Sequence, residues 1–96
     1  MDKLLNKYGF RKVSDYLWIL RDGEKDKVRV SLSYERGFAW SEKAGNFEYR
    51  EWVVTVYERK PRDLFLTKAV MYSTLNKFEQ RFVEYANGTS LAREKS

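Results

Sequence analysis

The sequence predicts an α+β domain: an antiparallel β-meander of four to five strands, with a short N-terminal helix and a longer C-terminal helix packed on one face. Three observations lead to this fold class. The run 52–57 is almost entirely β-branched or aromatic, as in a strand buried on at least one face. Residues 27–34 alternate between apolar and polar side chains, which is typical of a strand with one wet face. From Met71 to Tyr85, apolar residues recur at helical spacing.

The N-terminal part of the chain predicts a helix and two strands. Residues 2–8 form a short helix that must dock onto the sheet, because an isolated helix of this length is marginal. The strand expected over 13–20 carries apolar groups on both faces, which places it in the sheet centre or between two layers. Asp22-Gly23 predicts a hairpin turn into the strand 27–34. A one-residue slip there would bury Arg29, so its register should be well specified.

Two more strands are expected in the middle of the chain. Arg36-Gly37 predicts a tight turn into a short strand over 38–42. That strand is a candidate for the sheet edge and for pairing with another chain. A long strand is expected over about 47–59, followed by a turn through 60–63, where Pro61 cannot donate to a ladder.

Residues 64–72 allow two interpretations. They form either a strand followed by a helix from Thr74, or part of one helix that begins near Lys68. We favour the first, because β-branched residues in the segment prefer strands and Thr74 can cap a helix. The helix is expected to end at Asn87-Gly88.

Length and composition limit both the architecture and the chemistry. Ninety-six residues suffice for one modest core, so we predict a single domain over 1–88 and a polar, flexible tail over 89–96. The chain has no cysteine and no histidine, which excludes disulfides, zinc–thiolate sites and Ser-His-Asp or Cys-His catalysis. Glycine-rich phosphate loops are also missing. We therefore expect a protein that is not an enzyme and uses no cofactor or metal.

The sequence also predicts where the protein works. The N-terminus lacks the apolar stretch of a signal peptide. No apolar run approaches the roughly 20 residues that span a bilayer. We therefore expect a cytoplasmic protein that does not contact membranes.

The positive charge of the chain raises the question of an acidic partner. The formal net charge is +5, with an isoelectric point of about 9.5, and basic proteins often bind nucleic acid. However, the excess is spread along the chain, as +2 over 1–48, +1 over 49–63 and +2 over 64–96. A surface stripe that binds phosphates would instead concentrate the positive charge in one part of the chain.

Basic and aromatic residues on the expected strands and in the turn 60–63 form a candidate binding surface: Arg29, Trp40, Arg50, Trp52, Arg59, Lys60 and Arg62. Arginines beside stacking rings are typical of single-strand nucleic-acid binding. The favoured interpretation is nevertheless that Trp18, Trp40 and Trp52 lie in the core, because strand tryptophans mostly bury their rings. Two or more exposed indoles framed by guanidinium groups on one continuous face would instead favour a protein that binds a nucleic-acid strand.

Three sets of acidic residues are candidates for acid–base or metal chemistry: the pair Glu48 and Glu51, the pair Glu79 and Glu84, and the trio Asp22, Glu24 and Asp26. The first pair should face opposite sides of a strand, and the second should diverge on a helix. The trio lacks the later bidentate glutamate of a calcium loop. For all three sets, the favoured interpretation is that the carboxylates are solvent-exposed surface charges without a catalytic or metal-binding role.

These observations lead to a functional hypothesis and one alternative. The leading hypothesis is a protein-interaction or regulatory module, which could self-associate through a sheet edge. The alternative is a nucleic-acid-binding protein that uses a basic, aromatic sheet face. No family motif is found, although a short chain rich in Lys and Tyr is similar in texture to accessory proteins of phages and mobile elements.

Overall fold

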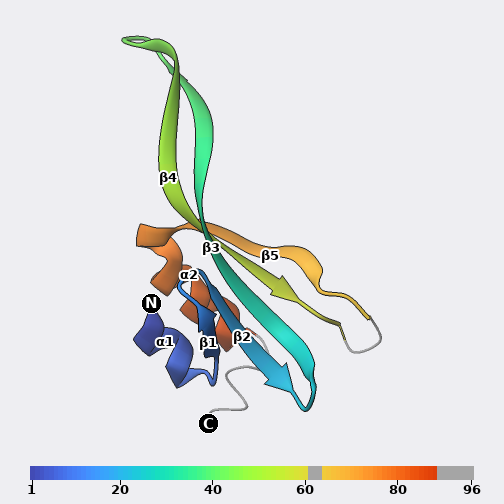
Figure 1. Ribbon diagram of the computed structural model, residues 1–96. Helices are drawn as coiled ribbons and strands as arrows, with labels where there is room; N and C mark the ends of the chain where they lie inside the picture. Colours follow the sequence, from blue (N-terminus) through green and yellow to red (C-terminus); the bar gives the residue numbers. More distant parts are fainter. Residues whose placement is uncertain (61–63, 89–96) are drawn as a thin grey trace.

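The computed structural model describes residues 1–60 and 64–88, apart from the side chains of Asp22, Lys68 and Ala69. It contains seven elements: α1 (Asp2–Lys7), β1 (Arg11–Ser14), β2 (Leu17–Asp22), β3 (Lys25–Ser41), β4 (Gly45–Glu58), β5 (Thr67–Thr74) and α2 (Leu75–Asn87). The strands form one antiparallel sheet in the order β1-β2-β3-β4-β5 (Figure 1). This confirms the predicted α+β meander with a helix at each end. The expected turn at Pro61 and the tail 89–96 lie outside the described residues.

The core forms between the two helices and one face of the sheet. Leu5 of α1 and Phe78 and Phe82 of α2 are fully buried. They pack on apolar residues of the four strands β2 to β5, namely Trp18, Leu20, Val28, Val30, Val54, Val56 and Met71. Because alternate residues of a strand share a face, the even-numbered residues of β3 and β4 point toward the helices.

β3 and β4 are much longer than their neighbours, and together they extend beyond the sheet. β2 pairs with β3 only as far as Ser31, and β5 pairs with β4 only from Val53 onward. Residues 33–52 therefore form a two-stranded hairpin, here called the arm. Figure 1 shows the arm rising alone from the sheet and the helices, here called the base. The molecule is accordingly elongated, with extents of 51 × 27 × 25 Å.

The predicted turn at Arg36-Gly37 is wrong, because β3 runs through it without a break in register. The structure gives Gly37 a different role. A Cβ atom on Gly37 would collide with the ring of Tyr49, its cross-strand partner, lying 2.6 Å from the hydroxyl oxygen. The glycine is therefore needed for the close approach of a ring and not for a turn.

The predicted single strand over 13–20 is also wrong, because the chain reverses at Asp15-Tyr16 and forms β1 and β2. The Ser14 hydroxyl accepts a hydrogen bond from the Tyr16 amide at 3.3 Å. Side-chain bonding of this kind favours turns without glycine or proline. The missed hairpin adds one strand to the expected set, and the false turn at 36–37 removes one. The expected number of strands is therefore right, although the strand boundaries at these two places are wrong.

The remaining expected elements are present with shifted ends, and the strand expected over 64–72, for example, covers Thr67–Thr74. Residues 67–74 form a strand and α2 begins at Leu75 with Thr74 at its N-cap, as the favoured interpretation of this segment predicted. The helix ends before Gly88. The Asp22-Gly23 hairpin is confirmed, and Gly23 has the positive φ of +66° that such a turn requires.

Candidate functional site

The helix-covered face of the sheet continues onto the arm, where no described element covers it. Cross-strand pairing puts the even-numbered arm residues on this face: Tyr34 with Trp52, Arg36 with Arg50, Phe38 with Glu48, and Trp40 with Asn46. We call this surface the aromatic face. Its apolar pattern is the outward extension of the core pattern at Val28, Val30 and Leu32. The same alternation that builds the core thus produces a surface of rings.

The rings of the aromatic face are open to solvent. The exposed fractions are 72% for Phe38, 66% for Trp40 and 55% for Tyr34. Trp52 is 39% exposed. Exposed apolar patches on soluble proteins mark interaction sites more often than they mark unused surface.

Trp52 anchors a ring cluster at the root of the arm. Its ring lies 5.1 Å from the Tyr34 ring and stacks on the Tyr16 ring at 5.7 Å, with an interplanar angle of 14°. Tyr16 comes from the turn between β1 and β2, so the cluster joins the arm to the base. A cavity of about 470 Å³ lies beside it, lined in part by Trp52 and Leu75. The π surface of Trp52 is therefore partly engaged within the molecule.

The charges of the aromatic face form a small ion-pair group centred on Glu48. Its carboxylate lies 3.5 Å from the Arg50 guanidinium and 3.9 Å from that of Arg36. The Arg36 guanidinium also lies over the Phe38 ring, 5.5 Å from its centroid. Exposed pairs of this kind contribute little stability, but they orient both arginines beside exposed rings.

The opposite face of the arm carries two carboxylates near its root and the rings of Phe47 and Tyr49 further out. Glu35 and Glu51 are cross-strand partners on that face. The pKa of Tyr72, at the root of this face, is raised by partial burial and by the charges of Glu35 and Glu51. In total the arm carries four acidic and three basic side chains: Glu35, Glu42, Glu48 and Glu51 against Arg36, Lys43 and Arg50. The positive excess of the protein therefore lies outside the arm.

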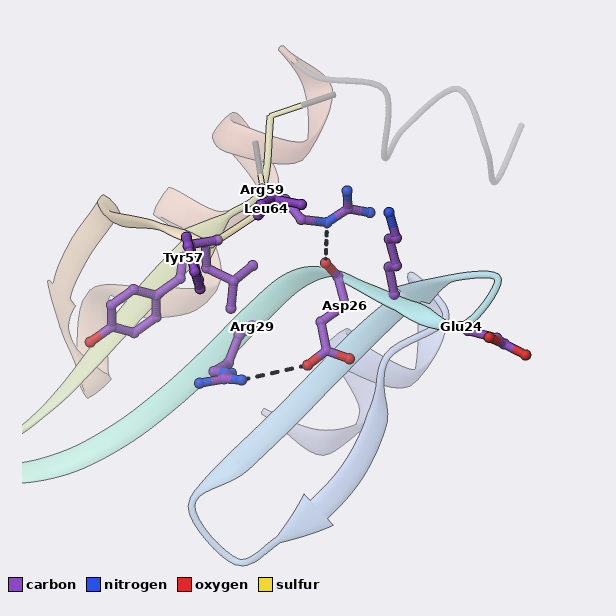
Figure 2. A pocket seen from close by; sticks show the side chains of 9 residues that line it. Glu24, Asp26, Arg29, Tyr57, Arg59 and Leu64 are labelled. Carbon is purple, nitrogen blue, oxygen red and sulfur yellow. Dashed lines mark hydrogen bonds and ion pairs between the residues drawn. The ribbon is translucent and has the colours of Figure 1, made fainter. Parts of the chain in front are cut away.

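A second feature lies on the base, where a cavity of about 630 Å³ opens on the sheet face away from the helices (Figure 2). Arg29 and Arg59 approach it from β3 and from the end of β4. The Arg59 side chain donates through Nε to the Asp26 carbonyl oxygen at 2.8 Å, and Arg29 donates to the Asp26 carboxylate at 3.5 Å. Tyr57 and the exposed Leu64 also line the cavity. Both arginines are thus bound to Asp26 within the chain.

The structure divides the predicted binding surface between these two places. Trp40, Arg50 and Trp52 lie together on the aromatic face, whereas Arg29 and Arg59 line the cavity on the other face of the sheet. Lys60 is exposed just beyond Arg59, and Arg62 lies outside the described residues. One continuous basic surface is therefore not formed by these seven residues.

Core burial was predicted for all three tryptophans, and this is confirmed only for Trp18, which is 3% exposed. The prediction is wrong for Trp40 and Trp52, because the helices stop short of the arm. Sequence reasoning also missed Tyr34 and Phe38 as surface groups. The alternation that places them on the Trp40 face was visible, but the assumed turn at 36–37 hid it.

The acidic groups follow the sequence-based expectations only in part, because Glu79 and Glu84, expected to diverge, both line one cavity beside α1 and α2. Glu48 and Glu51 lie on opposite faces of β4. The Asp26 carboxylate forms ion pairs with Arg21 at 3.4 Å and with Arg29 at 3.5 Å. The side chain of Asp22 lies outside the described part. Within residues 1–60 and 64–88, no cluster of three acidic side chains is placed to hold a metal ion.

Comparison with known proteins adds no further assignment. No family model, curated protein or solved structure matches the chain. Among the described helices, none is both long enough and apolar enough to cross a membrane. Function is therefore argued from the surface of the molecule.

Proposed function

We propose that this protein is a small, non-enzymatic interaction module, cytoplasmic in location, that binds a protein partner through the aromatic face of the arm. The observation that carries the proposal is the exposure of Phe38 and Trp40 on one face of a ribbon that projects from the base. Aromatic residues and arginine are the groups most enriched at the centres of protein interfaces. Rings on a two-residue period can enter separate pockets of a partner.

The charge of the arm favours a protein over nucleic acid. A phosphate backbone is bound mainly by unpaired basic groups, and its affinity grows with their number. On the aromatic face, Arg36 and Arg50 both contact Glu48, and the opposite face carries Glu35 and Glu51. A strand of nucleic acid lying along this ribbon would meet a nearly neutral surface with acidic flanks. A partner surface of apolar pockets and mixed charge fits it better.

A specific observation supports the alternative of single-stranded nucleic acid. Trp40 is open to solvent on the same face as Arg36 and Arg50, and an open indole can stack on a base. Trp52, the second indole on this face, is 39% exposed, so two open indoles do lie beside guanidinium groups, which is the arrangement that favours a nucleic-acid strand. The contacts of Trp52 with Tyr16 and Tyr34, and the pairing of both arginines with Glu48, weigh against this alternative. If it held, tryptophan fluorescence would change when oligonucleotides are added at low salt, and the affinity would fall as salt is raised.

Two matched substitutions test the proposal. Phe38→Ala removes a ring from the aromatic face, and Phe65→Ala removes an equally exposed ring from the base. The wild-type chain and the Phe65→Ala variant should retain the same protein from a cell extract, and Phe38→Ala should lose it. Equal retention by all three chains, or an oligonucleotide response that Phe38→Ala abolishes, would reject a protein partner on this face.

A further inference from the structure

The arm has a free edge whose length and residue order suit a second copy of this chain. Leu32 donates through its amide to the Tyr16 carbonyl oxygen at 2.9 Å, which is the last contact between β3 and the β1–β2 turn. From Ser33 to Ser41, no described strand pairs with that side of β3 (Figure 1). Over these nine residues, the backbone groups of every second residue are left free to pair with another strand.

The direction of these groups follows from the hydrogen bonds at the base. The backbone groups of Leu32 point toward β2, and residues two apart in a strand point the same way. Tyr34, Arg36, Phe38 and Trp40 consequently direct their amides and carbonyls away from β4. β3 has no bulge over this stretch, and the only proline of the chain lies elsewhere. A bulge and a proline, two devices that commonly block an open edge, are therefore missing from 33–41, and Arg36 is the one charged residue among the four that face outward.

We propose that two copies of the protein pair along this edge, β3 against β3 and antiparallel, to form a continuous four-stranded sheet of two arms. Full overlap of the free stretch puts Ser33 opposite Ser41 of the second copy, with the two-fold axis at Gly37. The outward-facing residues then meet as hydrogen-bonded pairs, Tyr34 with Trp40 and Arg36 with Phe38, as the ladder requires.

The side chains favour this register over its neighbours. Tyr34 meets an indole and Arg36 meets a phenyl ring, and both kinds of cross-strand pair are favourable. A shift of two residues in one direction would place Arg36 directly opposite its own copy, and like charges opposite each other are unfavourable. A shift in the other direction would leave Tyr34 without a partner residue on the free edge. The register of full overlap thus combines the most hydrogen bonds with the best side-chain pairs.

The free edge of β4 is less suitable. Its free stretch, 45–52, has eight residues, so its midpoint falls between two residues. Full overlap would set outward-facing residues against inward-facing ones and break the ladder. Each edge has one arginine and one aromatic residue at its root, but the β4 edge carries Glu48 and Asn46 where the β3 edge carries Phe38 and Trp40.

Edge pairing is compatible with the proposed function and extends it, because it uses the backbone edge and leaves the aromatic face open. The two aromatic faces would join into one surface about twice as wide. A two-stranded ribbon is marginal in water, and a four-stranded sheet with an apolar face is not. This inference concerns the purified chain alone, so it can fail while the partner assay succeeds, and the reverse also holds.

The test combines measured mass with two proline variants. Phe38→Pro removes an amide from the proposed edge, and Glu48→Pro removes one from the β4 edge at the cross-strand position. Sedimentation equilibrium should give a concentration-dependent dimer for the wild-type chain and for Glu48→Pro, and a monomer for Phe38→Pro. A monomeric wild type at every concentration overturns the proposal, and so does loss of the dimer in Glu48→Pro alone.

The register has a separate test that does not depend on proline. The chain has no cysteine of its own, and Ser33→Cys and Ser41→Cys are conservative changes. In the proposed register these positions form a non-hydrogen-bonded pair with Cα atoms about 4.5 Å apart, within reach of a disulfide. Mild oxidation should cross-link a mixture of the two variants and leave each variant alone uncross-linked. Cross-linking of either variant by itself, or none in the mixture, contradicts the register.

Discussion

Tyr85 illustrates how single residues of α2 connect the helix to the sheet. Its hydroxyl donates to the Glu58 carboxylate on β4 at 2.9 Å. Burial, together with this bond and the charge of Glu58, raises the pKa of Tyr85. The native state therefore holds the phenol proton more tightly than the unfolded chain does. By linkage, the resulting stabilisation is complete below the unfolded pKa of about 10 and is lost as pH rises above it.

Tyr85→Phe should therefore reduce stability in a pH-dependent way. At pH 7 we expect a loss of about 1.5–3 kcal/mol in the free energy of unfolding, which is the usual contribution of a hydrogen bond to a charged group. Above about pH 10, the difference between wild type and variant should narrow, because only the wild type has this phenol to ionise on unfolding. Urea unfolding of both proteins between pH 7 and 11 measures this. A constant difference over that range would contradict the assignment.

Gly37 tests the packing of the arm at the level of two residues. Gly37→Ala should raise the free energy of unfolding because alanine loses less backbone freedom on folding. The substitution should also lower it, because the new Cβ atom displaces the Tyr49 ring, so we expect little net change. In a Tyr49→Ala background, nothing opposes the gain, and Gly37→Ala should stabilise by about 0.5–1 kcal/mol. A double-mutant cycle from urea unfolding gives the coupling energy. No coupling between the two positions would mean that the ring does not occupy the space above Gly37.

At the scale of elements, the alternation of β3 could be predicted from sequence, and its length could not. Val28 and Val30 were correctly assigned to the core face. A glycine in a strand and a glycine in a turn look alike in one sequence, and only Tyr49 across the ladder distinguishes them. The turn at Asp15-Tyr16 carries no glycine, proline or asparagine, and Ser14-Asp15, a weaker turn signal, was overlooked within an apolar alternation. Only the error at Gly37 arises from a contact that sequence spacing does not encode.

The arm and the base should be energetically separable. Glu35 and Glu51 form a hydrogen-bonded pair, so a two-residue Asn-Gly turn can replace residues 36–50 between them. The core of the base is untouched by this change. We expect the free energy of unfolding to change by no more than about 1 kcal/mol. Urea unfolding checks this, and loss of a cooperative transition would show that the base depends on the arm.

At the scale of the molecule, composition gives the net positive charge of the chain but not where on the surface that charge lies. The sign of the net charge suggested nucleic acid, but the arm itself carries more acidic than basic groups. The aromatic content predicts core filling, and this is confirmed for Phe78 and Phe82 of α2, which are fully buried, but not for Phe65 of the base, which is exposed. The prediction also fails for the arm, because the helices reach only half of a long sheet. Which part of a strand is covered depends on tertiary arrangement and not on the local pattern.

The most direct test of the account is whether the arm-shortened chain still retains the partner that the full chain captures. The proposal places binding on the aromatic face, so shortening the arm should abolish retention while the base unfolds at the same urea concentration. Undiminished retention by the shortened chain would place the binding surface on the base and contradict the account.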